Sequence, residues 1–473
     1  MISLRSSWMP SVRCLLLVCG WVGSSLAPVH GQAYKGPVGY NTLVSELGGS
    51  LETGAGINVA FVEASSGAAG RYMPDVTDAQ FVGKTITAGS GASNGNSSHA
   101  LDVGRLFFGN SSSMSPGITN VTVYEANDWI NSRLAPGGSG TPLTESFRVS
   151  NHSYVGGGTE AASVNLMMRM DYYVNQSGTT VVVGANNGNS NALPGVFMQG
   201  YNSISVGRSD GQHSHGFTNF YGANRIKPDL VAPIGSTSAA AGVVSSAASL
   251  LHAKADNMGV NAADARRPEV IKSILMSGAT KEPGMNWDRT NTRPLDDRYG
   301  AGQLNIRNSY YTMAAGQFDG HLGAPSSQIG LRGWDYEASL AGNDTAMYYE
   351  FAVGNWGVED LSVMLNWNIQ VVDTDPSAGV FAPAASLANL SLTLLDSTDS
   401  VIDFSNSAVD NVEHLSLDFL GTGTYRFRVQ NHSNFSNSFA LSWRMTAVPE
   451  PGSGGVLLLL TVSLIARRTR RLG

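Results

Sequence analysis

Short β-rich runs alternate with helical patterns along residues 57–279, and this alternation constrains the fold more than any other feature of the chain. Five runs are rich in β-branched residues and bounded by Gly, Asn or Ser, at 57–63, 121–125, 147–151, 180–185 and 203–207. Three helical patterns lie among and after them, at 160–174, 238–254 and 268–279. Strands separated by helices are typical of a parallel sheet with helices on both faces. We therefore predict an α/β domain over residues 33–316.

Polar side chains stand at the ends of three of these runs. Glu63 ends the first run, Ser153 follows the third, and Asn186 follows the fourth. In open α/β sheets, functional residues lie just beyond the carboxyl ends of the strands. We expect these three side chains to meet at one edge of the sheet.

A candidate nucleophile lies at the start of the helix predicted at 238–254. Ser236-Thr-Ser238 leads into a run of small residues. Backbone N–H groups converge at a helix N-terminus and the helix dipole favours negative charge there, so an alkoxide or oxyanion would be stabilised. The ordinary alternative is that Ser238 is only the N-cap of the helix.

The segment ahead of this serine carries a family resemblance. Lys227-Pro-Asp-Leu-Val-Ala-Pro233 together with Ser238 resembles the serine segment of subtilisin-like proteases, the subtilases. Further segments match the family in its own order, at 54–63, 99–104, 151–156, 181–188, 268–276 and 299–302. The order acid, His, Ser is that of subtilisin and not that of chymotrypsin. The resemblance implies a subtilisin-like fold and the chemistry of acyl transfer.

The resemblance also implies a role for each matching residue. Ser238 would attack the peptide carbonyl, His99 would take its proton, and Glu63 would orient the imidazole. The Asn186 side-chain amide and the Ser238 backbone N–H would hold the oxyanion. The implied substrate-binding residues are Ser153, Tyr154, Gly156 and Gly188. No cofactor is required for this chemistry.

The chain departs from the family at the triad acid. Glu63 stands where the family has Asp, and its side chain is longer by one methylene group. Glu serves as the triad acid on other folds, so we interpret Glu63 as a working substitution, with Asp102 as an alternative acid. Around Ser238, the family's Gly, Met and Pro are replaced by Ser236, Ala239 and Gly242.

Two functions remain open at this stage. One is a secreted serine endopeptidase that acts on protein or peptide substrates. The other is a catalytically inactive matrix or adhesion protein that retains a subtilase scaffold. The presence of His99, Ser238 and Asn186 favours activity, because an unused site would be expected to lose at least one of them.

Residues 317–446 have a different pattern. Apolar residues recur with period two at 347–353, 390–395, 415–419 and 425–429, separated by Gly, Asn, Asp and Ser. This pattern predicts a β-sandwich domain. It resembles the pre-peptidase C-terminal domain of secreted proteases. Asp396, Asp399 and Asp403 could bind calcium, although Asp is also a common turn residue.

The first 32 residues have the pattern of a secretory signal peptide. Arg5 and Arg13 precede or enter a short apolar run, and small residues follow it. Both cysteines, Cys14 and Cys19, lie inside this segment. A processed chain would therefore have no disulfide and no thiol nucleophile.

Residues 447–473 predict a sorting segment. Pro449-Glu-Pro451 leads into an apolar stretch at 454–466, and four arginines follow within residues 467–471. This arrangement resembles a PEP-CTERM signal, which implies export, a transient transmembrane helix, processing by an exosortase-type enzyme and an exopolysaccharide matrix as partner. A plain single-pass anchor is the alternative, although the apolar stretch is short for an ordinary span.

The formal net charge is −7, from 29 basic and 36 acidic residues. An acidic chain is not a general nucleic-acid binder.

Overall fold

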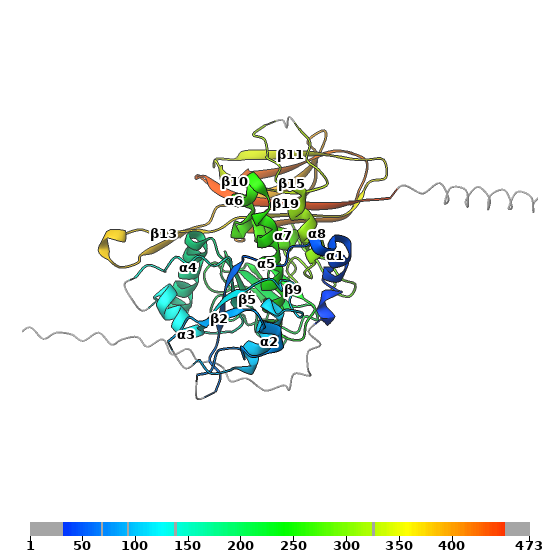
Figure 1. The fold of residues 1–473 in the computed structure, drawn as a ribbon. Coiled ribbons are helices and arrows are strands. Elements are labelled where there is room, and N and C mark those ends of the chain that lie inside the picture. Colours follow the sequence, from blue (N-terminus) through cyan, green and yellow to red (C-terminus); the bar gives the residue numbers. More distant parts are fainter. Residues whose placement is uncertain (1–31, 68–69, 92–93, 137–139, 324–326, 450–473) are drawn as a thin grey trace, which may run out of the picture.

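The computed structural model describes residues 32–449, except 68–69, 92–93, 137–139 and 324–326. The predicted signal peptide and nearly all of the predicted sorting segment lie outside the described residues. Figure 1 shows an α/β unit with a second unit of β-strands packed on one side of it.

The α/β unit is built on a seven-stranded sheet. The strand order is β2-β3-β1-β4-β5-β6-β9, and every neighbouring pair is parallel. The strands are β1 Asn58–Glu63, β2 Thr85–Ala88, β3 Asn120–Glu125, β4 Val149–His152, β5 Thr180–Gly184, β6 Ile204–Arg208 and β9 Leu230–Ala232. All five strands expected from the sequence are present.

The helices of this unit include the three that the sequence predicts. They are α1 Tyr40–Leu47, α2 Ser98–Phe108, α3 Ala126–Trp129, α4 Glu160–Ser177, α5 Thr237–Asp256, α6 Ala262–Ala265, α7 Pro268–Gly278 and α8 Ile306–Ala315. A small antiparallel pair, β7 Gly216–Phe217 and β8 Ile226–Lys227, completes the unit.

Both faces of the sheet are buried, as β1 illustrates. Val59 and Phe61 pack into a core shared with α2 and α5, whereas Ala60 and Val62 pack into a second core shared with α3 and α4. Successive side chains of a strand point to opposite faces, so a run of apolar residues without alternation fits a sheet covered on both sides. The predicted α/β fold class, with helices on both faces of a parallel sheet, is confirmed.

The second unit is a β-sandwich of two antiparallel four-stranded sheets, in the orders β10-β19-β12-β17 and β11-β18-β15-β16. Its strands are β10 Arg332–Leu340, β11 Thr345–Val353, β12 Val358–Asn366, β15 Leu390–Asp396, β16 Val401–Ser405, β17 Val412–Leu420, β18 Gly423–Asn431 and β19 Asn437–Ala447. A hairpin of β13 Gln370–Asp373 and β14 Pro383–Ser386 extends from it toward α4 (Figure 1). The predicted β-sandwich is confirmed.

The two units share a buried interface around α7. Arg444 of β19 is fully buried and donates hydrogen bonds to the carbonyl oxygens of Ser277 (2.8 Å) and Ala279 (3.0 Å). The hydroxyls of Ser273 and Ser442 lie 2.7 Å apart across the same interface. Buried polar groups that lose their partners are costly, so this interface fixes the sandwich against the α/β unit.

Across residues 32–449, outside the four internal gaps, no helix combines the length and apolar character needed to cross a membrane. The transmembrane helix expected at the C-terminus falls on residues beyond that range.

Candidate active site

The carboxyl end of β1 places Glu63 against His99. Glu63 is the last residue of β1 and is fully buried. His99 lies in the first turn of α2, which Ser97 caps by accepting a hydrogen bond from the Ala100 N–H (3.3 Å). His99 Nδ1 and Glu63 Oε2 are 2.6 Å apart. The Glu63 side chain therefore reaches the His99 imidazole.

Each member of this pair changes the titration of the other. Burial raises the pKa of Glu63, although the nearby His99 opposes that shift. The carboxylate of Glu63 raises the pKa of His99 above its usual 6.5, although burial of the imidazole opposes that shift. Glu63 Oε1 is buried and has no hydrogen-bond donor among the described residues. The site thus holds a carboxylate with only one of its two oxygens in use.

Asp102, the alternative acid, does not contact the imidazole. Its side chain is 45% exposed, and its nearest ion-pair partner is Arg105 at 3.6 Å. No hydrogen bond joins Asp102 to His99, although both residues belong to the described part of the chain. Asp102 contributes only a distant electrostatic effect that raises the pKa of His99.

Ser238 lies in the first turn of α5 but does not cap it. The cap is Ser236, whose Oγ accepts a hydrogen bond from the Ala239 N–H (3.2 Å). The Ser238 hydroxyl is half-buried and donates to the Ser153 carbonyl oxygen at 3.2 Å. The structure describes both Ser238 and His99 and shows no hydrogen bond between them. The capping alternative for Ser238 is therefore wrong.

The helices α2 and α5, which carry His99 and Ser238, pack closely at Gly242. A Cβ atom at Gly242 would lie 3.2 Å from both the Cγ1 atom and the carbonyl oxygen of Val103. Such contacts are tighter than ordinary van der Waals contact, so a larger residue would push the two helices apart. This contact gives a physical reason for glycine at position 242.

The end of β4 is tied to α5 by polar contacts. Asn151 Nδ2 donates to Ser245 Oγ of α5 at 2.9 Å, and Ser153 Oγ donates to Asn151 Oδ1 at 2.7 Å. Ser153 is only 3% exposed. Its side chain therefore acts inside the protein, while its carbonyl oxygen faces the Ser238 hydroxyl.

The two adjacent asparagines after β5 have different surroundings. The Asn186 backbone is fixed by Ser214, but its side chain is exposed and has no hydrogen bond among the described residues. Asn187 is exposed as well, but its side-chain oxygen accepts a hydrogen bond from the Thr237 N–H at 3.0 Å. The side-chain amide tied to the turn before Ser238 is thus that of Asn187, and the predicted oxyanion role of Asn186 stays a prediction.

The side chains of Asn186 and Asn187 differ in their contacts because both residues lie beyond the end of β5. β5 ends at Gly184, so the alternation that orients side chains within a strand no longer applies two and three residues later. A Cβ atom at Gly184 would lie 3.1 Å from the Thr237 carbonyl oxygen. This close approach brings the chain after Gly184 within reach of the helix start.

The remaining predicted substrate-binding residues, Tyr154, Gly156 and Gly188, have different local surroundings. Tyr154 is half-buried, and its hydroxyl is 3.1 Å from His152 Nδ1. Gly156 is half-buried, and Gly188 is exposed with a φ of +87°. A positive φ is unfavourable for residues with a side chain, so Gly188 gives this loop its bend.

Three of the other buried histidines, His152, His213 and His252, are held by internal partners. His152 is fully buried, and burial lowers its pKa to about 3. His213 Nε2 lies 2.8 Å from the Arg298 carbonyl oxygen, and burial lowers the pKa of His213 to about 4. His252 Nε2 lies 2.9 Å from Thr180 Oγ1. Each therefore has a structural explanation.

No group of three or more His, Cys, Asp or Glu side chains suited to a metal ion occurs in the part of the chain that the structure describes. Asp396 Oδ1 accepts hydrogen bonds from the Thr398 N–H (2.8 Å) and the Ser400 N–H (3.0 Å) within a turn. Asp399 pairs with Arg426 at 2.9 Å, and Asp403 pairs with Arg289.

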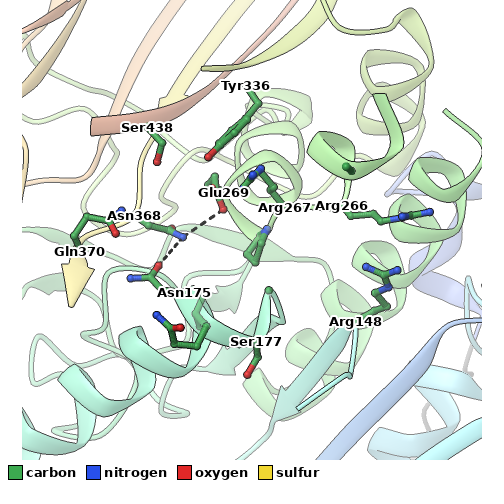
Figure 2. A pocket seen from close by; sticks show the side chains of 15 residues that line it. Arg148, Asn175, Ser177, Arg266, Arg267, Glu269, Tyr336, Asn368, Gln370 and Ser438 are labelled. Carbon is green, nitrogen blue, oxygen red and sulfur yellow. Dashed lines mark hydrogen bonds and ion pairs between the residues drawn. The ribbon is translucent and has the colours of Figure 1, made fainter. Parts of the chain in front are cut away.

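A separate cavity of about 470 Å³ lies where the two units meet. It is at the edge of the sheet opposite to Glu63 and His99. Arg148 precedes β4, and Ser177 lies shortly before β5, so this cavity is at the amino ends of the strands. Figure 2 shows Asn368 of the sandwich between Asn175 and Glu269, at 3.1 and 3.3 Å. Glu63, Ser153 and Asn187 belong to the other, carboxyl edge.

No family model and no curated protein matches the chain. Among solved structures, the fold is similar to the prenylagaramide maturation protease PagA, with 18% identity, 54% of this chain, 93% of that chain and a TM-score of 0.39. The serine protease of Aeromonas sobria has 14% identity, 83% and 89% coverage and a TM-score of 0.37. The nisin leader peptidase NisP from Lactococcus lactis has 16% identity, 58% and 92% coverage and a TM-score of 0.38. At these identities and TM-scores, the similarities support no conclusion about function.

Proposed function

We propose that the protein is a serine endopeptidase that hydrolyses peptide bonds through an acyl-enzyme on Ser238. The observation that carries this proposal is the 2.6 Å contact between His99 Nδ1 and the buried Glu63 carboxylate. A carboxylate on Nδ1 fixes the tautomer that leaves Nε2 free to take a proton. The start of α5, with Ser238 in its first turn, packs beside the helix that carries this histidine.

In the proposed reaction, the Ser238 hydroxyl turns from the Ser153 carbonyl oxygen toward His99 Nε2. Catalytic hydrogen bonds of this kind are often loose without substrate and tighten in the substrate complex. His99 takes the hydroxyl proton as Ser238 Oγ bonds to the substrate carbonyl carbon. It then gives that proton to the leaving amine as the C–N bond breaks. Water, deprotonated by His99, hydrolyses the ester and restores Ser238.

The proposed oxyanion donors are the Ser238 backbone N–H and the Asn187 side-chain amide. Asn187 replaces Asn186 in this role because its oxygen is bonded to the Thr237 N–H, one residue before the nucleophile. That bond anchors the amide at the turn before Ser238, and we propose that its N–H₂ group is the second donor. Fixed donors aimed at a developing negative charge need little reorganisation during the reaction.

The test is labelling with a fluorophosphonate probe, which reacts with an activated serine. The wild-type chain should be labelled, and Ser238→Ala should not. Ser236→Ala is the matched control, because it removes a neighbouring hydroxyl of the same helix start but leaves the nucleophile. Equal labelling of wild type and Ser238→Ala would mean that another residue is the nucleophile.

An inactive scaffold is the second candidate, and one observation favours it. The Ser238 hydroxyl is bonded to the Ser153 carbonyl oxygen and not to His99. If that bond persisted in the presence of substrate, the serine would not be activated. A folded wild-type chain that neither reacts with the probe nor cleaves a denatured protein substrate would establish this alternative.

We also propose that the enzyme is exported and is held at the membrane until an exosortase-type enzyme removes its tail. The apolar and Arg-rich C-terminal sequence supports this proposal. The exported enzyme would act at the cell surface or in an exopolysaccharide matrix. Mass spectrometry of the mature protein tests both cuts, since residues 1–32 and the tail should be missing.

A further inference from the structure

Four segments meet at one end of the β-sandwich. Strand pairing places Val353 opposite Gly423, and Asp396 opposite Tyr425, so the β11–β12, β15–β16 and β17–β18 turns share this end. Val358 pairs with Ala447, so β19 also ends there. We call this end, made of residues 354–357, 397–402, 419–422 and 447–448, the sandwich tip.

Large apolar side chains are exposed at the sandwich tip. Trp356 is 48% exposed, Val401 57% and Phe419 58%, and Ile402 adds a further partly exposed side chain. The Phe419 ring lies against Gly357, where an added Cβ atom would be 2.7 Å away. Single exposed apolar residues are ordinary on protein surfaces, but apolar residues gathered at one place indicate an interaction surface.

The sandwich tip offers little for electrostatic recognition. Its turns, 354–357, 397–400 and 421–422, contain no lysine or arginine. Its acidic residue Asp399 is paired with Arg426 at 2.9 Å. An apolar partner therefore suits this surface better than a polyanion.

The chain leaves the folded protein at this same place. The Val448 N–H donates to the Gly357 carbonyl oxygen at 3.2 Å, beside Trp356. The apolar stretch of the sequence begins at Gly454, six residues after Val448. Six residues span at most about 20 Å, so the start of that stretch can lie no further than this from the tip.

We propose that the sandwich tip is a membrane-contact surface, and that Trp356 and Phe419 enter the lipid interface while the C-terminal segment is inserted. Amphipathic aromatic rings favour the headgroup region of a bilayer. A segment inserted within about 20 Å of the tip brings these side chains to the lipid surface. This inference is independent of the catalytic proposal and depends only on membrane insertion of the C-terminal segment.

The test uses the absence of cysteine from residues 33–473. Single cysteines are introduced by Trp356→Cys, by Phe419→Cys and, as control, by Phe435→Cys. Phe435 is 37% exposed and lies in the β18–β19 turn, at the other end of the sandwich. Each chain, with its C-terminal segment, is labelled with an environment-sensitive fluorophore and reconstituted into phosphatidylcholine vesicles that contain spin-labelled quencher lipids.

In vesicles isolated by flotation, labels at 356 and 419 should be quenched several-fold more than the label at 435. Equal quenching at all three positions, no quenching at 356 and 419, or failure of the chain to float would each overturn the proposal. A blue-shifted label at 356 that lipids do not quench would show instead that the chain's own apolar segment covers the tip.

Discussion

Two buried carboxylates of the α/β unit, Glu63 and Asp229, differ in how many hydrogen-bond and ion-pair partners they have. Glu63 has one partner, His99, and its second oxygen has no donor among the described residues. Asp229 is 2% exposed and accepts hydrogen bonds from Lys227 (2.9 Å) and from both the N–H and the hydroxyl of Ser205. It also forms an ion pair with Lys272 at 3.3 Å.

The titration of the two groups follows from these contacts. Burial raises the pKa of Glu63 despite its histidine partner. Burial would also raise the pKa of Asp229, but Lys227 and Lys272 outweigh it and lower the pKa to about 2. The comparison teaches that a buried carboxylate with several hydrogen-bond and ion-pair partners stabilises the fold. A buried carboxylate with one partner and one unpaired oxygen is available for chemistry.

The largest expected effect is on catalysis at Glu63. Glu63→Gln should lower kcat by about 10⁴, because removing the anionic orienter of such a triad costs about that factor. Its melting temperature should change little, since one hydrogen bond to His99 can be kept. Steady-state kinetics and thermal unfolding measure the two effects, with Asp102→Asn as control. Loss of activity in Asp102→Asn but not in Glu63→Gln would reverse the assignment of the acid.

The matching change at Asp229 should act on stability. Asp229→Asn leaves two buried lysines without a counter-charge, and breaking a buried ion pair in this way costs about 3–5 kcal/mol. Urea unfolding measures the loss. Asp210→Asn is the control, because Asp210 pairs with Arg208 at the surface, where such pairs contribute about 1 kcal/mol or less. If the two variants lost the same free energy of unfolding, the buried Asp229 would contribute no more to stability than the exposed Asp210.

The adjacent asparagines give a third test, which concerns the oxyanion. Asn187→Ala should lower kcat by about 10²–10³ with little change in KM, as expected for loss of one side-chain donor. Asn186→Ala should keep kcat close to that of the wild type. The reverse pattern would restore the motif-based assignment to Asn186. If Ser238→Ala still reacts with the probe, the proposed function fails before this test applies.

The sequence predicts the fold, but it does not predict which of several neighbouring polar residues makes each contact at the site. The apolar runs, such as Val181–Val183 of β5, identify the strands because their burial on both faces requires continuous hydrophobicity. The 2.6 Å contact of Glu63 with His99 agrees with the expectation drawn from the order of the sequence motifs. The cap at Ser236 and the hydrogen bond between Asn187 and Thr237 depend on where α5 begins and β5 ends, and no residue pattern fixes those ends to within one position.

Contacts between distant segments are a second part that the sequence does not reveal. Lys272 of α7 joins the Lys227–Asp229 pair only because the fold brings it to Asp229 and to the Ser203 carbonyl oxygen, which lie just before β9 and β6. Ser273 and Ser442 are 169 positions apart and meet because the sandwich docks on α7. Neither serine is part of a motif, so only the folded arrangement identifies it.

The smallest expected effect is a shift in pH dependence, and it separates the two partners of the catalytic pair. His99 must be neutral to accept the Ser238 proton, so activity is lost as the pH falls through the pKa of His99. Because the Glu63 carboxylate raises that pKa above 6.5, the acid limb of the wild-type kcat profile should lie above pH 6.5. Glu63→Gln removes the negative charge, so the limb of its residual activity should move to lower pH.

Glu63→Asp keeps the charge but shortens the side chain in a backbone that suits Glu. Its acid limb should stay near that of the wild type while kcat falls partially. An unchanged limb in Glu63→Gln would mean that the carboxylate does not act on the titration of His99, and a limb that moves equally in Glu63→Asp would mean that side-chain length, and not charge, sets it.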